Sequence, residues 1–169
     1  MNIPSGSTVI VDSSVLFAIG GPENEKYQAF ERYFERKNIN VKMPERVAEE
    51  LGESPDEYEY QRNRLRAASE SGWLDSAETD FGVSGVSNVV DDTRDRMANI
   101  SSDDVSQDEI EKTDTVLAGL AYQYSRISDH VAVLVSDRVA ERAIRDVLTS
   151  RTKSITVVEG REFINHLVD

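Results

Sequence analysis

Cysteine is absent from the 169-residue sequence, and histidine occurs only at His130 and His166. The absence of cysteine excludes disulfide bonds, thiolate zinc sites and cysteine nucleophiles. The two histidines have neither the spacing of metal ligands nor a nucleophile partner in the sequence, so a general-base role is unsupported. A chain of this length can bury a core large enough to fold as a single domain, residues 1–169, without cross-links.

Lysine is also scarce. Only 5 of the 19 basic residues are lysines, and 32 acidic residues bring the net charge to −13. Such a surface is typical of proteins from a salt-rich cytoplasm, where the Debye length falls to about 3 Å at 1 M salt and like charges are screened. We therefore expect a halophilic protein. Because phosphate binding normally relies on Lys and Arg, any contact with nucleic acid should be local and metal-assisted.

Long apolar runs are missing as well. No run approaches the roughly 20 residues of a membrane span, and the first residues lack the features of a signal peptide. We therefore expect a cytoplasmic protein with no membrane partner. The sequence contains no GxxxxGK[ST] loop, which argues against P-loop chemistry.

Short β-branched segments alternate with amphipathic helical segments along the chain. The patterns predict strands at 8–11, 39–43, 131–135 and 155–158, with a brief edge strand beginning at 72–74. They predict helices at 13–19, 23–37, 44–51, 56–71, 86–100, 113–128, 138–150 and 160–168. This alternation predicts an α/β fold in three layers, with a central parallel sheet of four or five strands and helices on both faces. Residues 75–111 are acidic and match no clear pattern beyond their one helix.

Four acidic residues stand where such a fold binds ligands. Asp12 and Asp137 follow apolar strands, which places them at the carboxyl edge of the sheet. At about 100° per residue, Asp114 shares a helix face with Ala118 and Ala121. On the same basis Glu50 flanks the apolar positions of its own helix, whereas Glu49 points away from them.

Carboxylates at the rim of a buried face are costly unless they are paired or bind a metal. Four of them from separate segments make an all-oxygen site suited to Mg²⁺ or Mn²⁺. Such a site can polarise a phosphodiester and activate water, and two ions about 4 Å apart would also stabilise the leaving oxygen. Asp12, Glu50, Asp114 and Asp137 are therefore the candidate metal ligands.

Simpler interpretations exist for each acid taken singly. Asp12, Asp114 and Asp137 all stand where helix N-caps occur. Glu50 lies four residues after Arg46 and could form an exposed ion pair worth only about 0.3–0.5 kcal/mol. The order of all four acids within apolar contexts is more specific than any one of them.

The segments VIVDSSVLF, PERVAEEL, TDTVLAGLA and VLVSDRVAE resemble, in order, the four acidic motifs of PIN domains. The resemblance covers residues 8–51 and 112–158. It implies a metal-dependent nuclease like the VapC-type toxins and the ribosomal-RNA processing enzymes of that family. It also implies that Asp12, Glu50, Asp114 and Asp137 are catalytic and bind Mg²⁺ or Mn²⁺.

The resemblance extends to residues beside the acids. Ser14 resembles the hydroxyl residue that supports the first carboxylate, and Ser136 would support Asp137 in the same way. The chain departs from many members in having Val135 where they have Thr or Ser two residues before the last acid. Arg138 is a candidate RNA-phosphate contact. It shares one helix face with Arg142 and Arg145, and the alternative is that this face is solvated and pairs with Glu141 or Asp146.

The expected function is thus hydrolysis of RNA phosphodiester bonds by an endoribonuclease. The enzyme would be either the toxin of a toxin–antitoxin pair, with an antitoxin protein as partner, or an RNA-processing nuclease, and a homodimer is possible. One alternative is a non-catalytic PIN-fold RNA-binding or assembly subunit. Another is a phosphatase-like or nucleotide-binding protein that uses acidic magnesium ligands. A basic island at Arg62, Arg64 and Arg66 would either follow an RNA backbone or pair with nearby acids.

Overall fold

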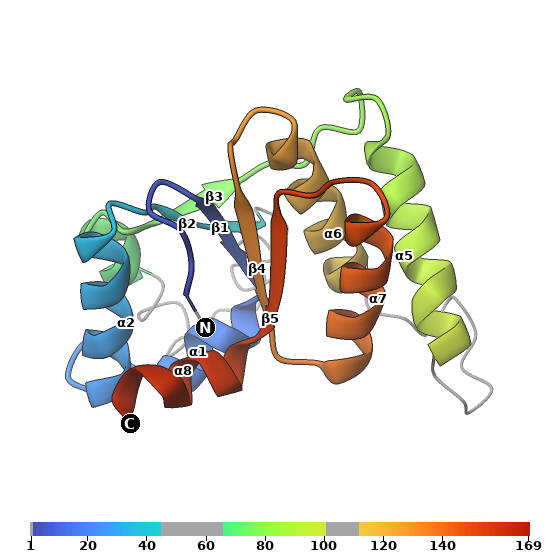
Figure 1. Ribbon diagram of the computed structural model, residues 1–169. Helices are drawn as coiled ribbons and strands as arrows, with labels where there is room; N and C mark the ends of the chain where they lie inside the picture. Colours follow the sequence, from blue (N-terminus) through green and yellow to red (C-terminus); the bar gives the residue numbers. More distant parts are fainter. Residues whose placement is uncertain (1, 45–65, 101–111) are drawn as a thin grey trace.

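The computed structural model describes residues 2–44, 66–100 and 112–169, without the side chains of Lys112 and Thr113. Across these residues a five-stranded, entirely parallel sheet forms the centre of the structure (Figure 1). Its strands are β1 (Thr8–Val11), β2 (Val41–Pro44), β3 (Leu74–Ala77), β4 (Val131–Val135) and β5 (Ile155–Glu159). They are arranged in the order β3-β2-β1-β4-β5, so β1 lies in the middle and β3 is an edge strand.

Helices cover both faces of the sheet. One face carries α1 (Ser13–Ile19), α2 (Glu25–Arg36) and α8 (Gly160–Val168). The other face carries α5 (Val86–Ile100), α6 (Lys112–Ser125) and α7 (Arg138–Thr149). The two groups of helices lie on opposite sides of the strands in Figure 1. The structure therefore confirms the predicted α/β fold in three layers.

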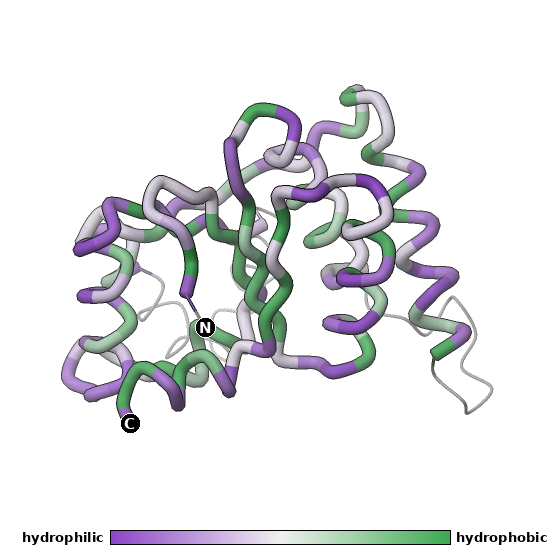
Figure 2. Tube along the Cα trace, viewed as in Figure 1, coloured by the Kyte–Doolittle hydropathy of each residue, from purple (hydrophilic) through white to green (hydrophobic). Residues whose placement is uncertain are grey.

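The strands divide the interior into two apolar cores, because successive side chains point to opposite faces. In β1, Val9 and Val11 belong to the core under α1, α2 and α8, whereas Ile10 belongs to the core under α5, α6 and α7. All five residues of β4 are buried, as expected of a strand covered on both faces. Figure 2 shows the consequence, with apolar strands inside and polar turns of helix outside.

Aromatic side chains fill the core between α2 and α8. Phe30 lies with its ring centroid 5.5 Å from Trp73 and 6.3 Å from Phe163, the latter pair in edge geometry. The Trp73 indole N–H donates to the Tyr27 hydroxyl at 3.3 Å, so its one polar atom is satisfied in the core. This packing fixes α8, which begins at the carboxyl edge of the sheet, against α2.

Strand register brings three chain segments together at that carboxyl edge. Val11 pairs with Leu134, and Val135 pairs with Glu159, so β1, β4 and β5 end side by side. Helices α1, α7 and α8 begin directly after these strands, on the lower side of Figure 1. Helix α6 directly precedes β4 in the crossover between parallel strands, so α6 ends near the edge of the sheet where β4 begins. Its first turn therefore lies at the opposite edge, which is the carboxyl edge.

Most predicted boundaries agree with the structure to within a few residues, and α5 spans the predicted 86–100. Pro44 is the last residue of β2 rather than the first turn of a helix. The rest of the helix predicted at 44–51, and most of that predicted at 56–71, lie outside the described residues; residues 66–70 are helical. Helix α6 ends at Ser125, three residues earlier than predicted. No helix in the described ranges is long and apolar enough to span a membrane.

Candidate functional site

Asp12 lies at the end of the central strand and is only 5 % exposed. Its Oδ1 accepts hydrogen bonds from the Ser14 hydroxyl at 2.5 Å and from the Val15 N–H at 3.0 Å. Its Oδ2 accepts the Ser136 N–H at 3.2 Å. Donors from α1 and from the end of β4 therefore fix both carboxylate oxygens.

Burial raises the pKa of the Asp12 carboxyl above its ordinary value of 3.8, although the hydrogen bonds from Ser14, Val15 and Ser136 act in the opposite direction. Within the described part of the chain, no lysine or arginine forms an ion pair with Asp12. The positive end of α1 gives partial compensation. Asp12 is therefore a buried carboxylate that a bound cation would stabilise.

Asp137 follows β4 and is exposed. Its Oδ1 accepts the Ala140 N–H at 2.8 Å, which makes it the N-cap of α7. Asp12 is likewise the N-cap of α1 through the Val15 N–H. The simpler capping interpretation is thus correct for both acids. It does not exclude a metal role, because a carboxylate has more acceptor positions than one cap occupies.

The structure gives Ser136 a different place from the one expected. Its hydroxyl is buried without a hydrogen-bond partner among the described residues, so it does not support Asp137. Its backbone N–H supports Asp12 instead. The hydroxyl of Ser14 does contact the first acid, as the family pattern implies.

Asp114 lies in the first turn of α6 and is 9 % exposed. Ala118 and Ala121, which share its helix face at about 100° per residue, are fully buried. Because α6 begins at Lys112, Asp114 lies inside the helix and is not its N-cap. The third acid is therefore directed toward the sheet at its carboxyl edge.

Glu159 is an acid at this edge that the sequence patterns did not single out. It ends β5, is 6 % exposed, and caps α8 by accepting the Glu162 N–H at 2.7 Å. The signal for it was present, since ITVVE followed by GREF is the same succession of strand, acid and helix that marks Asp12 and Asp137. The predicted strand 155–158 and helix 160–168 already left Glu159 between them, as Asp12 is left between 8–11 and 13–19.

Glu50, the remaining candidate acid, lies outside the described residues, as do Glu49, Arg46, Arg62 and Arg64. Among the residues that the structure does describe, no three acidic or histidine side chains come close enough together to hold one ion. Asp12, Asp114 and Asp137 share one edge of the sheet and offer the oxygen ligands that Mg²⁺ and Mn²⁺ prefer. Their donor atoms therefore suit a divalent cation. The described acids alone do not come together as a complete set of ligands around one ion.

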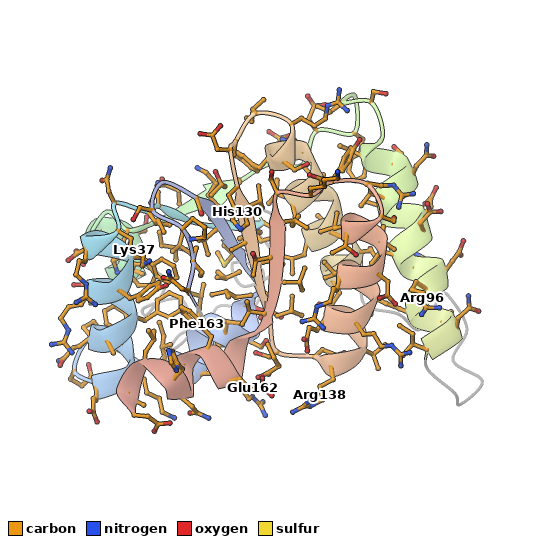
Figure 3. All side chains as sticks on the ribbon, viewed as in Figure 1. Lys37, Arg96, His130, Arg138, Glu162 and Phe163 are labelled. Atoms are coloured by element: carbon orange, nitrogen blue, oxygen red, sulfur yellow. The ribbon has the colours of Figure 1, made fainter. Side chains whose placement is uncertain are left out.

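Arg138 begins α7 beside Asp137 and pairs with Glu162 of α8 at 3.3 Å (Figure 3). Both side chains are largely exposed, at 78 % and 52 %. The alternative of a solvated face that pairs with Glu141 or Asp146 is confirmed for Arg145, which pairs with Glu141, but not for Arg138. Asp146 pairs with Arg96 of α5. A guanidinium group therefore stands exposed next to the candidate acids.

Comparison with known proteins identifies the family of the chain. The sequence model of the family described as "Halobacterial PIN domain" matches residues 5–169. No curated protein and no solved structure shows a significant match to the chain. The match covers the whole sheet and all the candidate acids, described or not. The chain therefore belongs to the halobacterial PIN domains, a branch of a family whose members are in general nucleases.

Proposed function

We propose that this protein is a metal-dependent endoribonuclease. The observation that carries the proposal is the burial and hydrogen bonding of the Asp12 carboxylate. This carboxylate is buried at the carboxyl edge of the central strand, where burial raises its pKa, and donors from two separate segments orient both of its oxygens. Keeping such a group there is costly without a cation. A bound divalent metal ion gives a physical reason for the arrangement.

Asp12, Asp114 and Asp137 would be the principal ligands of Mg²⁺ or Mn²⁺, and Glu50 would complete the site or position water. When bound, such a cation polarises the phosphodiester and lowers the pKa of water. The protein's own contribution is to orient the ligands. Ser14, Val15 and Ser136 hold Asp12 in place, and the cap at Ala140 holds Asp137.

Exposure differs between these acids in a way that suits a polymeric substrate. Asp137 is exposed, whereas Asp12 and Asp114 are buried. An RNA strand could reach Asp137 while water has limited access to Asp12. Because the chain carries a net charge of −13, we expect it to attract phosphate only locally, beside a bound cation or an exposed basic side chain such as Arg138. We therefore propose that RNA binding is confined to this edge.

The test is cleavage of single-stranded RNA by the purified protein in molar KCl. Cleavage should require Mg²⁺ or Mn²⁺, stop when a chelator is added, and be lost in Asp12→Asn and Asp114→Asn variants whose circular dichroism is unchanged. Retention of activity in both variants would exclude this site. RNA binding without any cleavage by the wild-type protein would favour the alternative of an RNA-binding or assembly subunit.

A role as the toxin of a toxin–antitoxin pair is a narrower form of the same proposal. It predicts that expression of the wild-type chain arrests growth and that Asp12→Asn does not. It also predicts that a small protein encoded beside it binds the chain and suppresses cleavage. Growth that is unaffected by expression, while RNA cleavage is observed in vitro, would favour an RNA-processing nuclease.

A further inference from the structure

Gly160, the first residue of α8, is buried where three elements meet. A β-carbon at this position would stand 2.5 Å from Val15 Cγ2 on α1 and 3.3 Å from the Ser136 hydroxyl after β4. The first distance is far shorter than a van der Waals contact between carbon atoms, so the neighbour would have to move. The absence of a side chain at Gly160 allows α8 to approach α1 and the end of β4 this closely.

Backbone conformation does not explain this glycine. Gly160 is not among the glycines with positive φ, which are Gly6, Gly20, Gly72 and Gly85. It is the first residue of α8, and glycine has a lower helix propensity than alanine. The helix alone would therefore favour alanine, and close packing accounts for the glycine.

Both residues that a β-carbon at Gly160 would meet donate backbone N–H groups to Asp12. The Val15 N–H donates to Oδ1, and the Ser136 N–H donates to Oδ2. The buried Ser136 hydroxyl has no hydrogen-bond partner in the described part of the chain, so packing rather than hydrogen bonding sets its place beside Gly160. A shift of either neighbour would change the orientation of the Asp12 carboxylate.

We propose that Gly160 is a positioning residue of the metal site, acting on Asp12 through Val15 and Ser136. The inference rests on the proposed function, because it assigns Asp12 to a metal ion. It adds a further segment of the chain, the start of α8, to the four segments that supply the candidate ligands. Groups that orient a metal ligand typically change metal affinity by 10- to 100-fold when altered, which sets the scale of the expected effect at about tenfold or more.

The decisive experiment compares Mn²⁺ binding to RNA-free Gly160→Ala, Val15→Ala and the double variant. Gly160→Ala should raise the dissociation constant of Mn²⁺ about tenfold or more. Because Val15→Ala removes the methyl group that the new β-carbon meets, the double variant should return to within about threefold of Val15→Ala alone. The amide resonances of Val15 and Ser136 should move in Gly160→Ala in the absence of metal.

Gly119→Ala is the matched control. Gly119 lies on α6 five positions after Asp114, about 140° away around the helix. Its new methyl would stand 2.6 Å from Val90 Cγ2 on α5, a clash of the same severity on a different side of α6 from Asp114. The substitution should lower thermal stability but leave the Mn²⁺ dissociation constant within about twofold of wild type. An equal loss of Mn²⁺ affinity in Gly119→Ala and Gly160→Ala would overturn the proposal, since the effect would then be general destabilisation.

The proposal is also overturned if Gly160→Ala binds Mn²⁺ like wild type, or if the double variant is not rescued. Should Gly160→Ala fail to fold, the double variant is compared with Val15→Ala. Its new methyl still lies near the Ser136 hydroxyl, so the Ser136 amide should move and the Val15 amide should not. If neither amide moves, Gly160 does not position Asp12. The amide measurements need neither metal nor RNA, so they remain decisive if wild-type protein fails to cleave RNA and the proposed function is wrong.

Discussion

Ser136 donates its backbone N–H to Asp12 Oδ2 at 3.2 Å, although 124 positions of sequence separate the two residues. The bond depends on the register of β1 and β4, in which Val11 pairs with Leu134. It depends on no property of the serine side chain, because any residue other than proline supplies the same N–H. The orientation of the first acid is therefore a property of the sheet rather than of a local motif.

Removing the Ser14 hydroxyl should weaken the site. In Ser14→Ala, Asp12 loses a hydrogen bond of 2.5 Å, and we expect the rate of RNA cleavage to fall about tenfold. Ser125→Ala is a matched control. The Ser125 hydroxyl also donates a short hydrogen bond, to the Tyr122 carbonyl, but it lies at the last residue of α6, at the opposite end of that helix from Asp114. Equal rates in the two variants would contradict a supporting role for Ser14.

The raised pKa of Asp12 gives a pH dependence of stability. Between the ordinary value of 3.8 and the raised folded value, the folded state binds more protons than the unfolded state. The contribution of Asp12 to the free energy of unfolding therefore falls as pH rises through this window, and the full cost is present above it. Urea unfolding without divalent ions should show wild type losing stability relative to Asp12→Asn as pH rises from about 4. A constant difference would count against this.

Salt should stabilise the protein. With a net charge of −13, screening of mutual repulsion should raise the melting temperature as KCl increases from dilute buffer to about 2 M. The measurement is a thermal melt followed by circular dichroism, with KCl as the only variable. A flat or falling melting temperature would remove the argument for a halophilic protein.

Arg138 should contribute to RNA binding. We expect Arg138→Gln to weaken RNA binding and to reduce the dependence of log affinity on log salt by about 1. Glu162→Gln removes the acid that pairs with Arg138, so it should strengthen RNA binding. Because both side chains are largely exposed, each substitution should change folding stability by no more than about 0.5 kcal/mol. Unchanged salt dependence in Arg138→Gln would assign this arginine to the ion pair alone.

Glu50 and Glu49 can be separated by helical phase, which the sequence alone supplies. Relative to Val47, an apolar position of the helix predicted at 44–51, Glu50 lies about 60° away and Glu49 about 160° away. We therefore expect Glu50→Gln to impair cleavage and Glu49→Gln to leave it nearly unchanged. Measured rates with the opposite order would exchange the roles of these two neighbours.

Periodicity predicted the architecture because strands and helices of each layer have a characteristic local pattern of apolar residues. The continuous apolar run 131–135 became the buried strand β4, and the amphipathic segment 138–150 became α7 almost to the residue. The order of strands in the sheet has no such local pattern, so the central position of β1 could not be predicted from residue spacing. Pro44 was assigned to a helix because proline suits the first helical turn. In the structure it ends β2, beyond Lys42, the last residue of β2 that pairs with β1, so its missing N–H falls outside that pairing.

The candidate site was predictable only in part, for the same reason. The positions of Asp12 and Asp137 after strands and of Asp114 on a buried helix face followed from local patterns. The donor from Ser136 and the close approach of Gly160 arise from contacts between distant segments. Helical spacing was enough to predict the pair of Arg145 with Glu141, whereas the partner of Arg138, Glu162, belongs to α8 and could not be found from its own helix.

The central position of β1 also has a consequence for the order of events during synthesis. β1 and Asp12 leave the ribosome early, but β4, which pairs with β1 along its whole length, follows more than half the chain later. Pairing across such a separation is slow, because the loop must close before the contact stabilises it. A nascent chain that ends before Ser136 carries Asp12 without the amide that holds its Oδ2. Synthesis beyond Ser136 is therefore a precondition for assembly of the candidate site, and shorter nascent chains are expected to leave RNA near the ribosome intact.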